Sequence, residues 1–180
     1  MIQYYTYEEW LEMERPDGVW RMELIDGMLY SMAAPSTVHQ RISMDLSRQF
    51  STYLLGKTCE VFAGLAVKLA KNTVYEPDLS VVCDKSKLDE RGCNGAPDLI
   101  IEILSPSNSR HDRIVKRKAY RKAGVKEYWI VYPDERSVEI HILVNDMYTI
   151  NVYTEEDGLI PVSVLPGFEI DLITLFPNEE

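Results

Sequence analysis

The chain has 180 residues, of which 46% are hydrophobic and 27% charged, a composition typical of one globular domain with a substantial core. Its formal net charge of −10 argues against a protein coated in nucleic acid, and no apolar run approaches the roughly 20 residues that span a bilayer. The N-terminus lacks a basic segment followed by an apolar stretch. The chain has an odd number of cysteines, and no two of them have CxxC spacing; they are Cys59, Cys83 and Cys93. We therefore expect a soluble cytoplasmic protein with reduced thiols, without a disulfide framework or a structural zinc site.

The predicted elements alternate between helix and strand along the chain. The first half predicts two helices, one at about 6–14 capped by Thr6 and one beginning after Ser36, and a hairpin turn at Asp26-Gly27. Strands are expected at 59–63, 65–70, 77–83, 98–104, 127–132, 138–143 and 147–153. A helix from about 111 to 123 should end at Gly124. This order predicts one α/β or α+β domain over residues 1–180, with a mixed sheet and a helical crossover after the 98–104 strand.

Glu102 is a carboxylate inside the apolar strand Leu99-Ile100-Ile101-Glu102-Ile103-Leu104. Because a strand that is apolar on both faces is covered on both faces, Glu102 should be buried. An ionised carboxylate is costly to bury alone, so it must be protonated, paired with a cation or bound to a metal. The sequence leaves all three alternatives open.

A second carboxylate can lie close to Glu102. If strand 77–83 pairs antiparallel with strand 98–104, Asp78 falls opposite about Ile103, within the roughly 7–8 Å that lets two carboxylates share a divalent cation. Asp98 shares the face of Glu102 but lies about 13 Å along the strand at a rise of about 3.3 Å per residue. Asp98 is therefore the weaker candidate.

The segment between Arg110 and Lys126 holds eight of the 19 basic residues of the chain and one acid, Asp112. On a helical projection, Lys116 lies inside the apolar arc of Val115, Ala119, Tyr120 and Ala123, whereas Arg117, Lys118, Arg121 and Lys122 face solvent. Lys116 therefore needs an acidic or phosphate partner, and a structural pair with Asp112 is an alternative. The basic surface of this helix could contact a DNA backbone, with Arg113, Arg117 and Arg121 as the candidate side chains.

These residues resemble the Uma2 family of restriction endonuclease-like proteins, which belongs to the PD-(D/E)XK nuclease class. The resemblance runs from Glu23-Leu24-Ile25-Asp26-Gly27 through His39 and Glu76-Pro77-Asp78-Leu79 to the segment from Gly95 to Ser107. It continues with Asp112, Lys116, Tyr120 and the segment from Gly124 to Trp129. Together these motifs cover nearly the whole chain.

The resemblance implies a mixed sheet flanked by helices, on which Asp78 and Glu102 hold Mg²⁺ or Mn²⁺ at a scissile phosphate. The lysine of the plain motif stands two residues after the Glu, where this chain has Leu104. The resemblance implies that Lys116, on the following helix, takes over the role of this lysine. Glu23 resembles an additional acid of the class, although it could be an exposed hairpin carboxylate. His39 is also matched, and could assist proton transfer, contact phosphate or make a local hydrogen bond.

We therefore hypothesise a magnesium-dependent endonuclease that hydrolyses phosphodiester bonds of DNA. Asp78, Glu102 and Lys116 would be catalytic, and Asp78, Glu102 and Glu23 would bind the metal. The alternative is a catalytically inactive nuclease-like module that binds nucleic acid or mediates oligomeric interactions. DNA is the expected partner, membranes are not, and a homodimer remains open.

Overall fold

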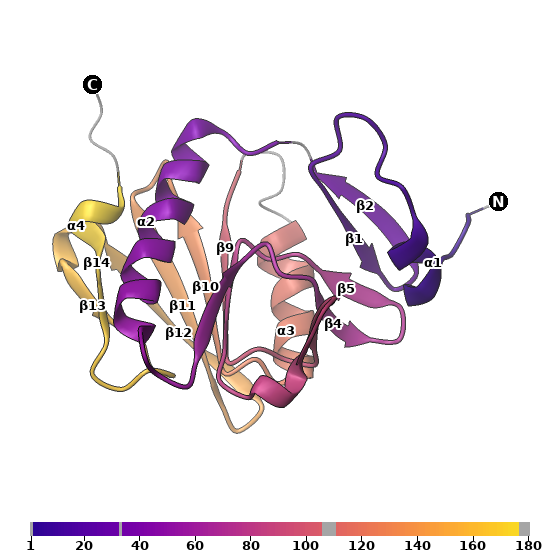
Figure 1. The fold of residues 1–180 in the computed structure, drawn as a ribbon. Helices are drawn as coiled ribbons and strands as arrows, with labels where there is room; N and C mark the ends of the chain where they lie inside the picture. The colour runs from indigo at the N-terminus through magenta and orange to yellow at the C-terminus, as the bar shows by residue number, and fades with distance from the viewer. Residues whose placement is uncertain (1, 33, 106–110, 177–180) are drawn as a thin grey trace.

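The computed structural model describes residues 2–32, 34–105 and 111–176, with the backbone alone for residues 111–113. The described part contains two six-stranded sheets and one two-stranded sheet. Figure 1 shows α2 (Thr37–Leu54) on one face of the central sheet and α3 (Arg117–Ala123) on the other. The mixed α and β architecture predicted from the sequence is confirmed.

The central sheet carries the strands that position the candidate site. Its order is β12-β11-β10-β9-β6-β3. The strands are β3 (Glu60–Ala63), β6 (Leu79–Val82), β9 (Leu99–Ile103), β10 (Glu127–Tyr132), β11 (Ser137–Val144) and β12 (Met147–Thr154). Strands β9 and β10 run parallel and all other neighbours run antiparallel. The parallel pair requires the helical crossover that the sequence predicted after Leu104.

The second sheet, in the order β2-β1-β5-β4-β8-β7, carries α1 (Tyr7–Glu12). Its strands are β1 (Arg21–Ile25), β2 (Met28–Met32), β4 (Val67–Ala70), β5 (Thr73–Tyr75), β7 (Leu88–Asp89) and β8 (Gly92–Asn94). The β1–β2 turn has positive φ at Asp26 and Gly27, as predicted. Sequence analysis missed β5, β7 and β8, because strands of two or three residues are too short to show a period.

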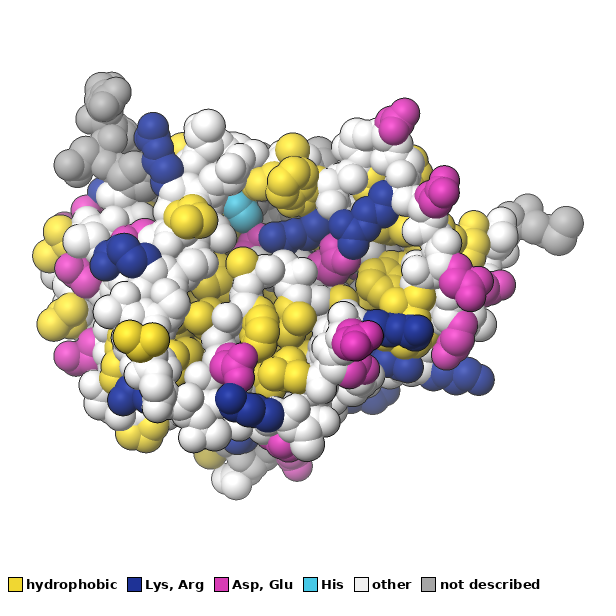
Figure 2. Space-filling model, in the orientation of Figure 1, with side chains coloured by type: hydrophobic (Ala, Val, Ile, Leu, Met, Phe, Trp, Pro, Cys, Tyr) yellow, Lys and Arg dark blue, Asp and Glu magenta, His cyan; other side chains and the backbone are white. Residues whose placement is uncertain are grey.

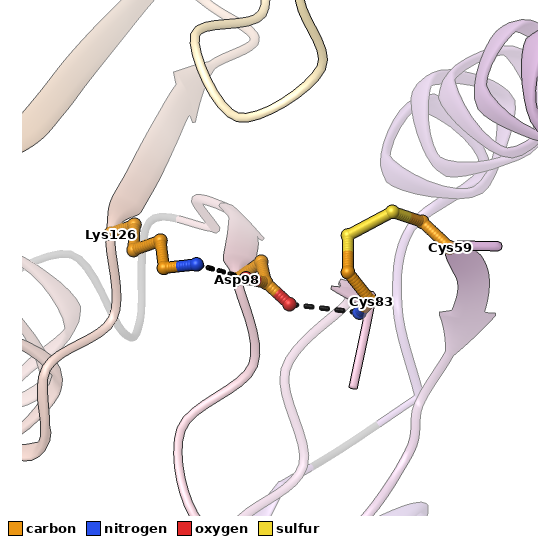
Figure 3. The surroundings of a disulfide bond; sticks show 4 residues. All are labelled: Cys59, Cys83, Asp98 and Lys126. Carbon is orange, nitrogen blue, oxygen red and sulfur yellow. Dashed lines mark hydrogen bonds and ion pairs between the residues drawn. A yellow bond between two sulfur atoms is a disulfide. The ribbon is translucent and has the colours of Figure 1, made fainter. Parts of the chain in front are cut away.

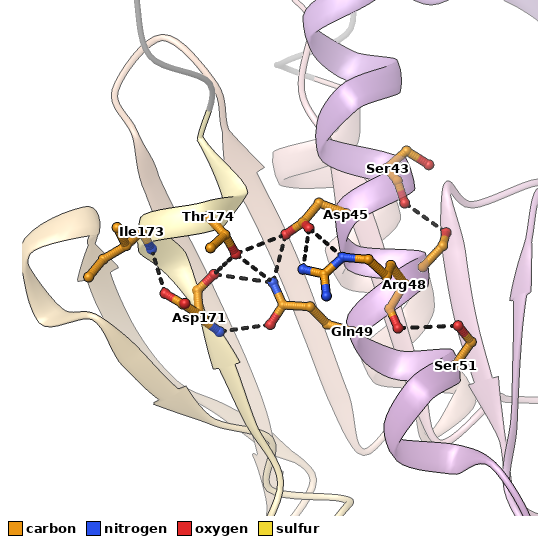
Figure 4. A network of polar contacts seen from close by, with 9 residues as sticks. Ser43, Asp45, Arg48, Gln49, Ser51, Asp171, Ile173 and Thr174 are labelled. Carbon is orange, nitrogen blue, oxygen red and sulfur yellow. Dashed lines mark hydrogen bonds and ion pairs between the residues drawn. The ribbon is translucent and has the colours of Figure 1, made fainter.

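The helix α2 buries one stripe, Ile42, Leu46, Phe50 and Leu54, against the central sheet. The C-terminal layer covers the same face and consists of β13 (Leu159–Pro161), β14 (Glu169–Asp171) and α4 (Leu172–Leu175). Figure 4 shows the polar link between this layer and α2. The backbone N–H of Asp171 donates to Gln49 Oε1 at 2.9 Å, and Thr174 Oγ1 donates to Asp45 at 3.3 Å. These hydrogen bonds fix the C-terminal layer against α2.

The crossover helix departs from the regular α-helix that the sequence predicted over 111–123. Its first part, His111–Lys116, is a π-helix, and the α-helix α3 follows and ends at Gly124 with φ 88°. Val115 is 40% exposed, while Lys116 and Tyr120 are buried. The wider π turn rotates the side chains away from the projection of a regular helix, so the inward stripe consists of Lys116 and Tyr120 rather than Val115.

The expectation that all three cysteines carry reduced thiols is wrong. Cys59 and Cys83 form a disulfide, and Cys93 is a buried free cysteine. The β3–β6 register pairs Glu60 with Val82, so the next residues outward on each strand, Cys59 and Cys83, face each other. Figure 3 shows Asp98 beside this bridge, accepting the backbone N–H of Cys83. The sequence could not indicate the bridge because the two cysteines are 24 residues apart and meet through strand pairing.

None of the helices within the described residues is long and apolar enough to cross a lipid bilayer.

The disulfide predicts a measurable stabilisation. Because the bridge closes a loop of 24 residues, reduction should lower the free energy of unfolding by about 3 kcal/mol in the chain-entropy account. Urea denaturation with and without reductant measures this loss, and Cys93→Ala is the matched control, since it should keep the response to reductant. Thiol titration of the unfolded, unreduced chain should find one free thiol. Three free thiols would contradict the bridge.

Candidate active site

The centre of the candidate site is a buried lysine between two carboxylates. The Nζ of Lys116 lies 2.9 Å from Glu102 Oε1 and 3.0 Å from Glu23 Oε1. The three residues are 2%, 4% and 1% exposed, respectively. They come from three elements: the π-helix, β9 and β1. Burial of the charges is tolerated because each one has an opposite charge in direct contact.

Additional hydrogen bonds orient both carboxylates. The hydroxyl of Tyr120, one helical turn after Lys116, donates to Glu102 Oε1 at 2.7 Å. The backbone N–H of Glu76 donates to Glu23 Oε1 at 3.0 Å. Burial, followed by the negative charges of Glu102 and Glu23, raises the pKa of Tyr120 well above its usual value. Tyr120 therefore remains a protonated donor over the whole physiological pH range.

Asp78, the residue immediately before the neighbouring strand β6, lies next to Glu102. The β6–β9 ladder pairs Leu79 with Ile101, and one further step sets Asp78 opposite Glu102 rather than opposite Ile103, the position expected from the sequence. Side chains at directly opposed positions of an antiparallel pair lie on the same face of the sheet. The Asp78 Oδ2 atom accepts the backbone N–H of Ile103 at 2.8 Å.

Two cationic or potentially cationic side chains also contact Asp78. Arg21 Nη1 lies 2.8 Å from Oδ1, and His39 Nε2 lies 3.0 Å from Oδ2. Burial alone would raise the pKa of Asp78, but the hydrogen bond and charge of His39, the charge of Arg21 and the N–H of Ile103 outweigh it. The net effect lowers the pKa of Asp78, which keeps it ionised at neutral pH.

A cavity of about 450 Å³ opens onto these groups. It is lined by Trp20, Arg21, Ser31, Met32, Ala34, Pro35, Ser36, His39, Asp78, Glu102, Ile103, Ser105 and Lys116. Figure 2 shows basic, acidic and histidine side chains side by side on this face, between α2 and the β1–β2 hairpin. The cavity is large enough for a phosphate group with its neighbouring atoms, and it brings both carboxylates to the same space.

The structure brings together Asp78, Glu102, Lys116, Glu23 and His39, five of the residues singled out from the sequence. Glu23 is buried, so the alternative of an exposed hairpin carboxylate is wrong. The side chain of His39 reaches Asp78 on another element, so its bond is not a local one. The side chain of Asp112 lies outside the described residues, and with it the alternative pair with Lys116.

Other candidates lie away from the cavity. Asp98, at the opposite end of β9, binds Lys126 Nζ at 2.7 Å and the N–H of Cys83 (Figure 3). Neither Arg117 nor Arg121 is among the residues that line the cavity, and Arg121 contacts Met147 Sδ at the start of β12. The side chain of Arg113 falls outside the described residues.

Sequence reasoning missed the roles of Arg21 and Tyr120. Arg21 stands two residues before Glu23, and this spacing places both on one face of β1. Tyr120 stands four residues after Lys116, so both lie on one face of the helix. Both spacings were visible in the sequence. The partner that each residue contacts was not, because it comes from another element.

The donor set fits a divalent cation with oxygen ligands. Among the residues that the structure describes, no group of three or more His, Cys, Asp or Glu side chains is arranged to hold a metal ion. Mg²⁺, however, is usually bound by one or two carboxylates together with waters and substrate phosphates. Asp78 and Glu102 supply two carboxylates to a cavity with room for both. The residues present therefore fit the ion, provided that waters and a phosphate complete its coordination.

The fold and the clustered acids define a restriction-endonuclease-like α+β protein. The structure superposes on the crystal structure of a putative nuclease belonging to DUF820 from Anabaena variabilis with a TM-score of 0.78 and 24% identity. The match covers 95% of this chain and 97% of that one. Residues 6–173 match the Uma2 family, described as "putative restriction endonuclease". The chain belongs to the Uma2 family.

Two uncharacterized proteins of the cyanobacterium Synechocystis are also similar. One is 29% identical over 171 residues, which cover 93% of this chain and 88% of that protein. The other is 27% identical over 131 residues, which cover 70% of this chain and 73% of that protein. The first similarity extends over both sheets and the crossover helix.

The buried charge cluster predicts a large difference between two lysines of one helical segment. Lys116→Met leaves Glu23 and Glu102 buried without their shared cation, so we expect a loss of about 3–5 kcal/mol in the free energy of unfolding. Lys118→Met removes the same charge from an exposed position and should change stability by less than about 0.5 kcal/mol. Urea denaturation at neutral pH measures both. Equal losses for the two variants would contradict the arrangement.

Proposed function

We propose that this protein is a magnesium-dependent endonuclease that hydrolyses phosphodiester bonds of DNA. The observation that carries the proposal is the convergence of Asp78, Glu102 and Lys116 on one cavity from three different elements. The pairing of two adjacent carboxylates with a lysine suits the transfer of a phosphoryl group to water. Membership of the Uma2 family supports the same reaction class.

Each residue of the cluster has a role that follows from its contacts. Asp78 and Glu102 would hold the ion. Glu23, which was expected from the sequence to bind the metal as well, contacts Lys116 from the second sheet and is not among the residues that line the cavity, so we propose it as a positioning residue. Lys116 would orient the attacking water or offset negative charge that develops on the phosphate. Tyr120 would hold Glu102 in one orientation through its hydrogen bond. Mg²⁺ or Mn²⁺, when bound, would polarise the phosphate and favour deprotonation of water.

The position of Lys116 accounts for Leu104 where the plain motif has a lysine. Leu104 packs in the apolar cluster between the central sheet and α3, together with Tyr120 and Val125. A lysine side chain from the helix reaches the same carboxylate from outside the strand, at 2.9 Å. The substitution in the strand therefore does not remove the cation from the site.

Two basic side chains beside Asp78 suit a polyanionic substrate. Arg21 and His39 line the cavity and could contact a phosphate once Asp78 binds a metal ion. Trp20, at the same cavity, is 56% exposed and offers an aromatic face to a base. We propose that Arg113, Arg117 and Arg121 attract the DNA backbone at longer range.

The proposal predicts metal-dependent nicking of plasmid DNA. The wild-type protein should convert supercoiled DNA to the nicked form with Mg²⁺ or Mn²⁺ and not with EDTA. Glu102→Gln, Asp78→Asn and Lys116→Ala should each lower the rate by about 10²-fold or more. Gel electrophoresis measures the conversion, and circular dichroism checks that each variant is folded.

The matched control for nicking is Asp98→Asn, because Asp98 immediately precedes β9, at the end of the strand opposite to Glu102, and is not among the residues that line the cavity. This variant should retain activity. Nicking that survives both Glu102→Gln and Lys116→Ala would overturn the assignment. DNA binding without cleavage at any metal concentration would instead favour the inactive nucleic-acid-binding module.

The contact between Arg21 and Asp78 predicts competition with the metal. Arg21→Gln removes a guanidinium from Asp78 Oδ1, so Mn²⁺ should bind at least threefold more tightly. Asp78→Asn should abolish this binding. Isothermal titration calorimetry with Mn²⁺ alone measures both. The matched control is Arg48→Gln, which removes a guanidinium from Asp45 on α2 and should leave the affinity unchanged. Weaker binding by Arg21→Gln would contradict the competition.

A further inference from the structure

The outer edge of the central sheet is formed by β12 (Figure 1). The four consecutive residues in its middle, from Thr149 to Val152, are all exposed. Ile150 is 49% and Val152 64% exposed, and alternation places both on the α3 side of the sheet. The strand thus leaves branched apolar side chains and one backbone edge uncovered by the described residues.

The hairpin geometry decides which backbone groups of β12 point outward. Asn145 and Asp146 form a two-residue turn with φ of 49° and 63°, so Val144 and Met147 exchange the first pair of hydrogen bonds. Bonded pairs alternate along an antiparallel ladder, so the even-numbered residues of β12 direct their N–H and C=O groups away from β11. Thr154 agrees with this parity, because its N–H donates to the side chain of Asp157 at 2.7 Å.

The outward groups of Tyr148, Ile150 and Val152 make no backbone hydrogen bond to another described residue. Edge strands are normally protected by charged side chains, proline, a bulge or short length. β12 has eight residues without a charge or a proline, and its register with β11 is regular throughout. The opposite edge, β3, has four residues, and one of them, Glu60, pairs with Lys85.

We propose that β12 pairs antiparallel with β12 of a second copy of this chain, so that the two central sheets join into one across a twofold axis. An uncharged strand is suited to its own copy, because two chains of net charge −10 meet there without like charges opposed on the paired strands. The pairing is self-complementary about the axis and therefore closes as a dimer rather than continuing as a fibre.

The parity of the hydrogen bonds selects a register. With Ile150 opposite Ile150 of the second copy, Tyr148 lies opposite Val152, and the outward groups of all three residues find partners. Pairing ends at Thr154, whose N–H already binds Asp157. The register also stacks Ile150 and Val152 of both copies on one face, where branched and aromatic cross-strand pairs stabilise sheets.

The experiment is the mass of the full chain in solution, measured by light scattering after size-exclusion chromatography. The wild-type protein should have twice the mass of one 20.8 kDa chain at high micromolar concentration. Raising the salt concentration should tighten the dimer, because screening weakens the repulsion between two acidic bodies. Ile150→Lys places two ammonium groups together at the axis, and it should weaken dimerisation at least tenfold.

A control and a second variant separate pairing from folding. Met44→Lys adds the same charge at another exposed apolar side chain, 69% exposed on α2, and should remain dimeric. Ile150→Pro removes an outward N–H but no hydrogen bond to β11, so circular dichroism should show a folded protein while the mass falls to one chain. A monomeric wild-type protein would overturn the proposal. This holds even if the β12 edge of that monomer binds an added β-strand peptide. A dimer that survives both Ile150 variants would also overturn it.

Discussion

The buried ammonium group of Lys116 is the constraint around which the other elements are arranged. A charge at 2% exposure must have opposite charges in contact, and here Glu102 comes from the central sheet and Glu23 from the second sheet. The crossover helix is therefore fixed against both sheets at one point. Tyr120 and Tyr75 surround the same cluster with aromatic rings, and their centroids lie 5.2 Å apart. The polar cluster and the apolar packing between the sheets thus depend on each other.

The two faces of the central sheet differ because successive side chains of β9 point to opposite faces. Leu99, Ile101 and Ile103 face the apolar layer of α2 and the C-terminal hairpin, whereas Ile100 and Glu102 face α3 and the second sheet. One face of the sheet is therefore a continuous apolar core, and the other accommodates charge at the end of the strand. Asp78 enters this polar end from β6. The negative charge of Asp78 is balanced by other groups than that of Glu102, namely Arg21, His39 and a backbone N–H at the cavity wall.

The proposed reaction and the proposed dimer use opposite parts of the same sheet. The cavity lies at the ends of β6 and β9, where carboxylates and basic side chains are concentrated. The free edge lies three strands away at β12, where charge is absent from eight successive residues. A net acidic chain is thereby able to keep a local basic lining for a polyanion and an uncharged edge for a second copy. Both features depend on where charge is placed rather than on its total.

The sequence alone determined the elements with strong periods, caps or turns: the helix after Ser36, the Asp26-Gly27 hairpin and the apolar strand around Glu102. It also singled out Glu102 and Lys116, because a charge inside an apolar stripe is visible without coordinates. Contacts between distant segments were decided by the tertiary structure. Strand register put Asp78 opposite Glu102 and joined Cys59 to Cys83, and the π-helix left Val115 exposed. The physical reason is that periodicity is a local property, whereas ion pairs, disulfides and short strands depend on the packing of segments far apart in the chain.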